Sequence, residues 1–256
     1  MGRIITIANQ KGGVGKTTTA INLSACLAEA GQHVMLVDFD PQGNASSGLG
    51  VEIEEHEHTV YDLMAEEAGL DECLVKNVQD NLDVLPSDMN LAGAEIEFQE
   101  IENKETLLKR YLDQVRDDYD FILIDCPPSL NILTINALTA ADTVLVPIQC
   151  EYYALEGLNQ VLKTVELVRK KLNPQLELEG VVFTMYDART NLSLQVVESV
   201  KSNLNQTIYK TIIPRNVRLA EAPSHGMSIN LYDTRSTGAE SYRMLAAEVM
   251  SRGEDL

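Results

Sequence analysis

A glycine-rich stretch near the start of the chain has the composition of a phosphate-binding turn. It reads Ala8-Asn9-Gln10-Lys11-Gly12-Gly13-Val14-Gly15-Lys16-Thr17-Thr18. The backbone N–H groups of such a turn can surround phosphate oxygens, and the positive end of a following helix adds attraction. Lys16 would bring an ammonium group to the β- and γ-phosphates, and the hydroxyl of Thr17 would coordinate Mg²⁺. The alternative interpretation is an ordinary glycine-rich turn with two solvated lysines.

The stretch departs from the common phosphate-loop pattern G-x-x-x-x-G-K-[ST] at its first position. That pattern would place glycine at position 10, where the chain has Gln10, and a second lysine, Lys11, follows directly. Lys11 comes too early in the loop to duplicate the role of Lys16. The second lysine therefore needs an explanation of its own.

Two apolar runs end in acidic residues. Val34–Asp38 continues to Asp40 two positions later, and Phe121–Asp125 ends directly in an aspartate. Continuous apolar runs are typical of buried parallel strands, and ligands bind beyond the carboxyl ends of such strands. We therefore expect these carboxylates to face the phosphates and a metal ion. Aspartate is also common wherever a strand turns into a loop, so either run alone would be ambiguous.

Apolar runs alternate with helical patterns along the whole chain. We expect strands at Ile4–Ala8, Val34–Asp38, Leu82–Pro86, Phe121–Asp125, Thr143–Ile148, Gly180–Thr184 and Ile208–Ile212. We expect helices at Lys16–Ala30, Lys104–Val115, Ile132–Ala140, Leu155–Leu172, Ser193–Leu204 and Glu240–Ser251, with short surface helices in residues 45–100. The alternation predicts one α/β domain over residues 1–256, with a doubly wound, mostly parallel sheet and helices on both faces.

Length and composition agree with a globular protein that works inside the cell. The 256 residues are 45% hydrophobic, enough for a substantial core. No run of about 18 apolar residues is present, so we expect no membrane span, and the first strand leaves no room for a signal peptide. The four cysteines show no C-x-x-C spacing, which favours reduced thiols in the cytoplasm. The four histidines form no credible metal-binding pattern.

Charge is distributed unevenly along the chain. The net charge of −19 argues against a nucleic-acid partner, and residues 52–105 alone hold 17 acidic residues against 2 lysines. Residues 184–220 have the opposite balance, a net charge of +3 from five basic and two acidic residues. The five basic residues are Arg189, Lys201, Lys210, Arg215 and Arg218. Scattered surface charge would also explain this segment.

The motifs together resemble the ParA/Soj branch of the deviant Walker A ATPases. The phosphate loop and the two acidic strand ends carry most of the resemblance. Further matches are Glu151-Tyr152-Tyr153-Ala154-Leu155-Glu156-Gly157, Asp187-Ala188-Arg189-Thr190-Asn191, Ile213-Pro214-Arg215-Asn216-Val217-Arg218 and Ala222-Pro223-Ser224-His225-Gly226. The resemblance spans almost the whole chain and implies the P-loop ATPase fold of deviant Walker A type.

The resemblance also implies roles for individual residues. ATP and Mg²⁺ would be held by Lys11, Gly12, Gly13, Val14, Gly15, Lys16, Thr17 and Thr18, with Pro214 and Asn216 beside the adenine. Asp40 would place the attacking water and join Thr17 in the metal site, whereas Asp125 would act on the metal through bound water. Asp38 would support the loop. Lys11, Lys16 and Asp40 are the expected catalytic residues.

Lys11 is explained by a dimer. By resemblance, it reaches across a two-fold interface to the phosphates held by the partner subunit, so the homodimer forms only with ATP. Gly12 would let the two backbones approach closely. The dimer would bind double-stranded DNA non-specifically through the basic segment, a ParB/Spo0J-type centromere-binding protein would stimulate hydrolysis, and the protein would be cytoplasmic and nucleoid-associated. The sequence does not decide between a role in chromosome segregation and a role in plasmid segregation.

Three other functions are compatible with parts of the sequence. A MinD-like division-site regulator needs a basic amphipathic C-terminal helix for membrane attachment, but this chain ends in acidic residues. An iron–sulfur carrier needs positioned cysteine thiolates, and Cys126 between Asp125 and Pro127 is poorly placed for this. A DNA-bound adaptor with a purely structural nucleotide also remains. Measured ATP turnover would separate the adaptor from the ATPase.

Overall fold

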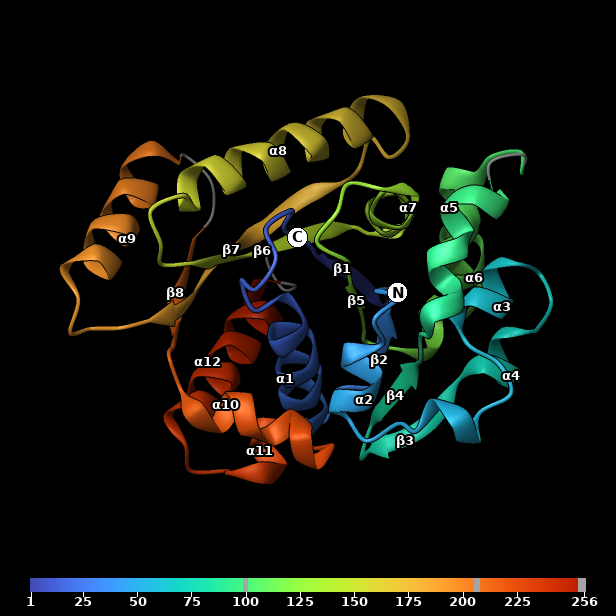
Figure 1. The fold of residues 1–256 in the computed structure, drawn as a ribbon, viewed down its shortest axis with the longest axis horizontal. Helices are drawn as coiled ribbons and strands as arrows, with labels where there is room; N and C mark the ends of the chain where they lie inside the picture. The colour runs from blue at the N-terminus through green and yellow to red at the C-terminus, as the bar shows by residue number, and fades with distance from the viewer. Residues whose placement is uncertain (99–100, 205–207, 253–256) are drawn as a thin grey trace.

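Eight strands form one sheet in the computed structural model, which describes residues 1–98, 101–204 and 208–252 (Figure 1). The strands are β1 (Arg3–Ile7), β2 (Val34–Asp38), β3 (Val75–Gln79), β4 (Leu82–Leu85), β5 (Phe121–Asp125), β6 (Thr143–Gln149), β7 (Glu177–Tyr186) and β8 (Ile208–Pro214). Their order across the sheet is β3-β4-β2-β5-β1-β6-β7-β8. Neighbouring strands run parallel except for the hairpin of β3 and β4, which is antiparallel.

The central strand β1 marks the point where the direction of strand addition changes. The chain leaves β1 for β2 on one side, crosses back through β5, and continues to β6 on the other side of β1. Ligands bind beyond the carboxyl ends of strands at such a switch point. The register pairs Asp125 with both Ile7 of β1 and Asp38 of β2, so the phosphate loop and the acidic residues meet at one edge.

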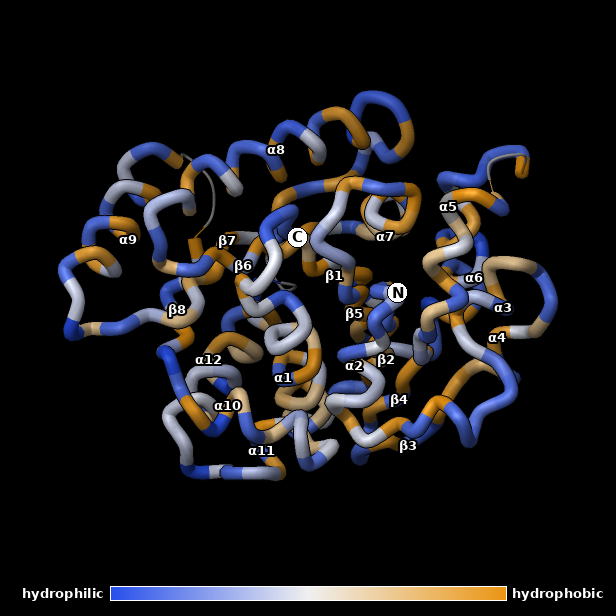
Figure 2. The backbone as a smooth tube through the Cα atoms, viewed as in Figure 1, coloured by the Kyte–Doolittle hydropathy of each residue, from blue (hydrophilic) through white to orange (hydrophobic). Residues whose placement is uncertain are grey.

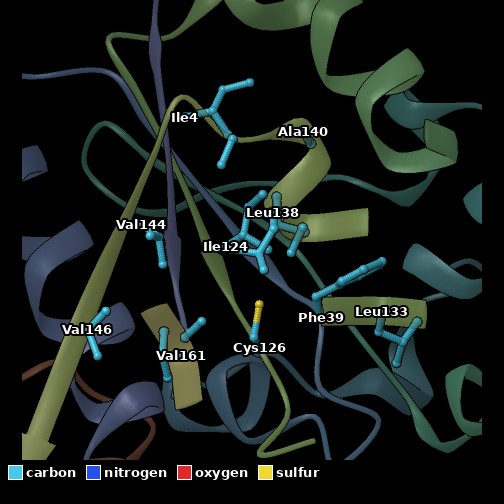
Figure 3. Packing of buried hydrophobic residues seen from close by; sticks show 14 of the residues in the cluster. Ile4, Phe39, Ile124, Cys126, Leu133, Leu138, Ala140, Val144, Val146 and Val161 are labelled. Atoms are coloured by element: carbon cyan, nitrogen blue, oxygen red, sulfur yellow. The ribbon is translucent and has the colours of Figure 1, made fainter. Parts of the chain in front are cut away.

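Side chains alternate between the two faces of the sheet, and each face has its own core. Ile4 belongs to a cluster under α6 (Leu107–Val115), α7 (Ile132–Ala140), α8 (Ala154–Lys171) and α9 (Asn191–Asn203). Figure 3 shows it grouped with Ile124, Val144 and Leu138. Ile5 packs on the opposite face under α1 (Lys16–Glu29) and α12 (Thr237–Arg252). Helices on both faces confirm the predicted doubly wound class.

Short elements complete the described chain. The short α-helices are α2 (Asn44–Gly48), α3 (Val60–Met64), α4 (Leu70–Cys73), α5 (Ala94–Glu97), α10 (Val217–Glu221) and α11 (Ile229–Tyr232). Five 3-10 turns lie at Ile53–Glu55, Met89–Gly93, Lys104–Thr106, Arg116–Asp118 and Ala222–His225. Figure 2 shows apolar residues concentrated along the central strands, while α8 alternates between apolar and polar residues. This pattern places one side of α8 on the core and the other in solvent.

The seven predicted strands are all present, but one strand was missed and two begin earlier than expected, β1 by one residue and β7 by three. The missed strand is β3, an edge strand whose residues Lys76 and Asn77 are exposed and polar, so it lacks an apolar pattern. It also contains a positive φ of 54° at Asn77. β7 begins at Glu177, three residues before the predicted Gly180. The short helices expected in residues 45–100 are confirmed.

A buried ion cluster ties the C-terminal helix to the amino-terminal edge of the sheet. The carboxylate of Glu179, only 3% exposed, accepts hydrogen bonds of 2.7 Å from Arg3, Thr143 and Tyr209. The guanidinium of Arg252, from α12, lies 4.3 Å from the ring centroid of Tyr209 and donates to the backbone oxygen of Glu179. Because a buried charge is costly without partners, this cluster depends on all its members.

Removing the central carboxylate should therefore destabilise the fold. We expect Glu179→Ala to lower the free energy of unfolding by about 3 kcal/mol, because the buried Tyr209 and Thr143 hydroxyls lose their acceptor and the partly buried Arg3 guanidinium keeps only the Val249 carbonyl. Urea denaturation measures the change. The exposed neighbour on the same strand provides the control, since Glu177→Ala should stay within about 0.5 kcal/mol of the wild type. Equal stability of the two variants would contradict the assigned role.

Candidate functional site

The phosphate loop joins β1 to α1 and is shaped by glycine. Gly13 and Gly15 have φ values of 74° and 85°, which residues with side chains rarely adopt. Gly15 is the N-cap of α1 and offers no side-chain cap, so the first N–H groups of the helix are not capped from this position. From β7, the buried Thr184 donates a 2.8 Å hydrogen bond to the backbone oxygen of Val14. The loop is thus held in a form suited to an anion.

Lys16 places a buried ammonium group at this loop. The residue is 6% exposed, and its Nζ donates a long hydrogen bond of 3.5 Å to the backbone oxygen of Lys11. Burial lowers the pKa of Lys16, whereas the nearby Asp125 and Asp40 act in the opposite direction. A bound phosphate would supply further negative charge and closer acceptor atoms than the 3.5 Å contact with the Lys11 carbonyl provides.

Asp125 is the clearest sign that the site takes a cation. Its side chain is completely buried, and among the described residues no hydrogen bond of good geometry reaches either carboxylate oxygen, although the Thr17 hydroxyl and the Lys16 ammonium group lie nearby. Burial, followed by the charge of Asp38, raises its pKa well above the usual range, while Thr17 and Lys16 oppose that shift. A buried carboxylate without partners is costly unless a cation compensates it. The donor set therefore fits Mg²⁺ near Thr17 and Asp125.

Asp38 and Asp40 have different surroundings although only one residue separates them. The carboxylate of Asp38 accepts hydrogen bonds from the backbone of Asp40 (3.3 Å) and from both the backbone (2.8 Å) and the hydroxyl (2.7 Å) of Ser46. Burial raises the pKa of Asp38 to about 6. Asp40 is 7% exposed and accepts a 3.0 Å hydrogen bond from the backbone of Gln42. Asp38 thus anchors the loop that follows β2 by accepting three hydrogen bonds, and Asp40 lies on that loop.

Lys11 is paired with a carboxylate of its own chain. Its ammonium group lies 2.7 Å from Glu151, and its side chain is 35% exposed. Gly12, the next residue, has no strained backbone angle, and an added Cβ would meet only Pro128, at 4.0 Å. Nothing within the described chain therefore requires glycine at position 12.

A pocket of about 250 Å³ opens beside the phosphate loop. Its wall includes Gly15, Thr18, Thr184, Pro214, Asn216 and Tyr242. The structure thus brings Pro214 and Asn216 next to the loop, where an adenine group was expected. The Asn216 side chain is already engaged, because it accepts from the backbone of Arg218 (2.7 Å) and donates to Thr237 (2.8 Å). It therefore shapes the wall of this pocket through fixed contacts.

The five basic residues expected to contact DNA lie in two groups. Arg189 and Arg215 are close at the carboxyl edge, since the backbone of Arg215 donates to Tyr186 (2.9 Å), and Arg218 follows in α10. Lys201 is in the last turn of α9 and Lys210 near the start of β8, toward the opposite edge. Within one chain α9 separates these two groups (Figure 1), and one composite basic surface on the two-fold dimer stays a prediction.

Two of these arginines are also paired within the chain. The Arg189 guanidinium donates two hydrogen bonds to the Asp187 carboxylate, of 2.9 and 2.7 Å, and the Arg189 backbone N–H donates a third, of 3.0 Å. Arg218 lies 2.8 Å from Glu221 and 3.5 Å from Asp233. All these side chains are substantially exposed except that of Asp187, so solvent screens the ion pairs. A DNA phosphate would compete with such carboxylates for the guanidinium groups.

Sequence reasoning gave no role to two residues of the site. Glu151 was part of a matched motif, but nothing in the sequence indicated that it pairs with Lys11. Thr184 gave no signal at all, because its contact with Val14 joins positions 170 residues apart. Long-range side-chain contacts of this kind depend on the fold and cannot be found from local patterns.

Two negative results bear on the site. Among the described residues, no group of three or more His, Cys, Asp or Glu side chains could hold a metal ion. In the same part of the chain, no helix is long and apolar enough to span a membrane.

Comparisons with known proteins agree with the geometry. Residues 2–178 match the family described as AAA domain. The chain is 59% identical over 253 residues to the sporulation initiation inhibitor protein Soj of Bacillus subtilis, covering 99% of this chain and 100% of that protein. It is 51% identical over 255 residues to the chromosome partitioning protein ParA of Caulobacter vibrioides, covering 99% and 96% of the two.

A solved structure provides a similar fold with a bound nucleotide. It is described as cobyrinic acid a,c-diamide synthase from Mycobacterium smegmatis with bound ADP and magnesium. The TM-score is 0.87 at 36% sequence identity, and the match covers 99% of this chain and 96% of the other. Sequence identity of 59% and 51% along nearly the entire length, joined to the phosphate loop and the acidic strand ends, places this chain in the ParA/Soj family of chromosome-partitioning ATPases.

Proposed function

We propose that the chain is an ATP-dependent dimerisation switch that hydrolyses ATP and binds DNA without sequence preference during chromosome or plasmid segregation. The observation that carries this proposal is the pairing of a preformed phosphate loop with Asp125, a fully buried carboxylate near Thr17 and Lys16 whose oxygens accept no hydrogen bond of good geometry from the described residues. Such a site suits a Mg²⁺–nucleotide, which brings the cation and the phosphates together. The names of the relatives add the link to chromosome partitioning.

Hydrolysis then depends on how the chain positions charge and water. The loop backbone and Lys16 hold the phosphates, and the Thr17 hydroxyl and Asp125 face the metal position. Bound Mg²⁺ supplies positive charge that neutralises the phosphate oxygens. Asp40 orients the attacking water through its carboxylate. Phosphoryl transfer needs mainly positioning and charge stabilisation of this type, and little covalent participation by the protein.

A dimer would explain two features that have no evident role within the single chain, the glycine at position 12 and the second lysine, Lys11. Gly12 is unconstrained within its own chain, which supports a close approach by a second backbone at this position. Lys11 is half-exposed and held by Glu151, so it can exchange this carboxylate for a phosphate of the partner subunit. Two nucleotides would then lie between the subunits of a two-fold dimer.

ATP turnover with and without DNA tests the hydrolytic part of the proposal. We expect slow release of phosphate from ATP by the protein alone and faster release with duplex DNA and a ParB/Spo0J-type partner. A protein that binds ATP but never releases phosphate under any of these conditions would instead be the DNA-bound adaptor with a structural nucleotide.

Charge placement supports non-specific DNA binding through the carboxyl edge near Arg189. The elements of acidic residues 52–105, including α3 and α4, lie on the side of the molecule away from α9 and β8 (Figure 1). DNA would therefore approach the basic side, and its binding would give the cytoplasmic protein its nucleoid association. Phosphate contacts of this kind do not depend on sequence and weaken with salt.

A salt series tests the DNA surface. Arg189→Ala should flatten the log–log dependence of DNA affinity on salt by up to about 2 units, because a dimer loses two phosphate contacts at about 0.9 unit each. Lys170→Ala is the matched control, since Lys170 is an exposed cation near the end of α8 and away from this edge. An unchanged slope for Arg189→Ala, with normal dimer formation, would exclude this residue from the DNA surface.

A further inference from the structure

A buried serine anchors the loop that contains Asp40. Ser46 is the third residue of α2 and has no exposed surface. Its hydroxyl donates a 2.7 Å hydrogen bond to Asp38 at the end of β2 and accepts a 3.2 Å hydrogen bond from the backbone of Ser87, just beyond β4. One side chain thereby joins the ends of two neighbouring strands to the helix that closes the loop.

The same contacts fix the backbone of the loop itself. Asp38 accepts from the backbone N–H of Asp40 at 3.3 Å, and the Asp40 carbonyl accepts from Gly43 at 2.9 Å. Gly43 lies directly against Ser87, because an added Cβ would stand 2.9 Å from the Ser87 carbonyl oxygen. The loop is therefore confined between the ends of β2 and β4, and its position follows from the Asp38–Ser46–Ser87 contacts.

These contacts are made of buried polar groups that depend on one another. Asp38, Ser46 and Ser87 are all 0% exposed. If Ser46 lost its hydroxyl, one Asp38 oxygen would keep only the Ser46 backbone N–H as a donor. The Ser87 backbone N–H would lose its acceptor. Unpaired buried groups carry a cost, so the loop would shift to find other partners. A shift of the loop moves Asp40 and leaves the phosphate loop, which is built on β1 and α1, in place.

We propose that Ser46 is a positioning residue for ATP hydrolysis, whose hydroxyl sets the place of the Asp40 carboxylate by joining Asp38 to Ser87. The inference rests on the proposed hydrolytic function and adds a residue to it. It separates two properties of the site, because the turnover rate depends on Ser46 while the affinity for nucleotide does not.

The test compares two adjacent serines of α2. Ser46→Ala should lower kcat for ATP by about 10- to 100-fold, since a misplacement of about 1 Å can have an effect of that size. Its KM for ATP and its affinity for ADP should change less than about 2-fold. Ser47→Ala is the matched control, because Ser47 is exposed on the same helix, and it should match the wild type. Ser46→Cys, nearly isosteric with a weaker donor, should fall between the two.

A double-variant cycle keeps the inference testable if stability also falls. Ser46→Ala and Asp38→Ala should be strongly non-additive in kcat, because each removes one partner of the same contact. Wild-type kcat in Ser46→Ala, or a loss of ADP affinity in proportion to kcat, would overturn the positioning role. If Ser46→Ala does not fold, Ser46→Cys tests the positioning role by itself, with a lower kcat than the wild type and an unchanged affinity for ADP as the expected result. Absence of wild-type turnover would overturn the proposed function together with this inference, whereas normal wild-type turnover with an unaffected Ser46→Ala overturns the inference only.

Discussion

Replacing Asp40 with alanine should lower ATP turnover by about 100-fold or more, because a carboxylate that orients or deprotonates the attacking water contributes on this scale. ATP binding and dimer formation should persist, since the phosphate loop and Lys16 are untouched. The variant is then expected to accumulate on DNA as an ATP-bound dimer. Phosphate release measures turnover, and DNA retention measures accumulation.

A second acidic substitution controls for the loss of a negative charge. Asp80 is exposed in the turn between β3 and β4, far from the phosphate loop in the sheet order, so Asp80→Ala should turn over ATP at the wild-type rate. Near-normal turnover by Asp40→Ala, under conditions where Asp80→Ala is also normal, would remove Asp40 from the mechanism.

Substitutions of the two lysines of the phosphate loop should block different steps, nucleotide binding for Lys16 and dimerisation for Lys11. Lys16→Ala is expected to reduce ATP affinity by about 100-fold or more, because it deletes several charge-assisted hydrogen bonds to the β- and γ-phosphates. Lys11→Ala should still bind ATP, since the Lys11 ammonium group is held by Glu151 in its own chain. It should nevertheless fail to dimerise, because the partner's phosphates lose their cross-subunit contact.

Fluorescent-nucleotide binding and light scattering separate these outcomes. ATP affinity distinguishes Lys16→Ala from Lys11→Ala, and molecular mass in ATP then distinguishes Lys11→Ala from the wild type. Normal dimerisation of Lys11→Ala with ATP would show that the cross-subunit role of Lys11 is wrong, whatever its effect on turnover.

The sequence predicted the parts of the fold that depend on local patterns. The seven apolar strands were recognisable because each contains a short run rich in apolar residues, and parallel strands must bring Asp38 and Asp125 to the same edge. The edge strand β3 was missed because Lys76 and Asn77 interrupt any apolar pattern. Edge strands need fewer buried residues, so their sequences carry a weaker signal.

The details of the site depend on contacts that no local pattern reports. Ser46 and Ser87 meet across 41 positions of the chain, and Thr184 reaches the phosphate loop from β7. The basic segment also depends on the fold. Arg189 precedes α9 and Lys201 lies in its last turn, so nearness in sequence alone does not place them side by side within one chain.

Sedimentation of the wild-type protein in ATP, in ADP and without nucleotide tests the proposed ATP-dependent dimer most directly. The account predicts a species of twice the 28.3 kDa chain mass with ATP and Mg²⁺, and the single chain with ADP or no nucleotide. A dimer of equal population in all three conditions, or a single chain with saturating ATP, would contradict the switch.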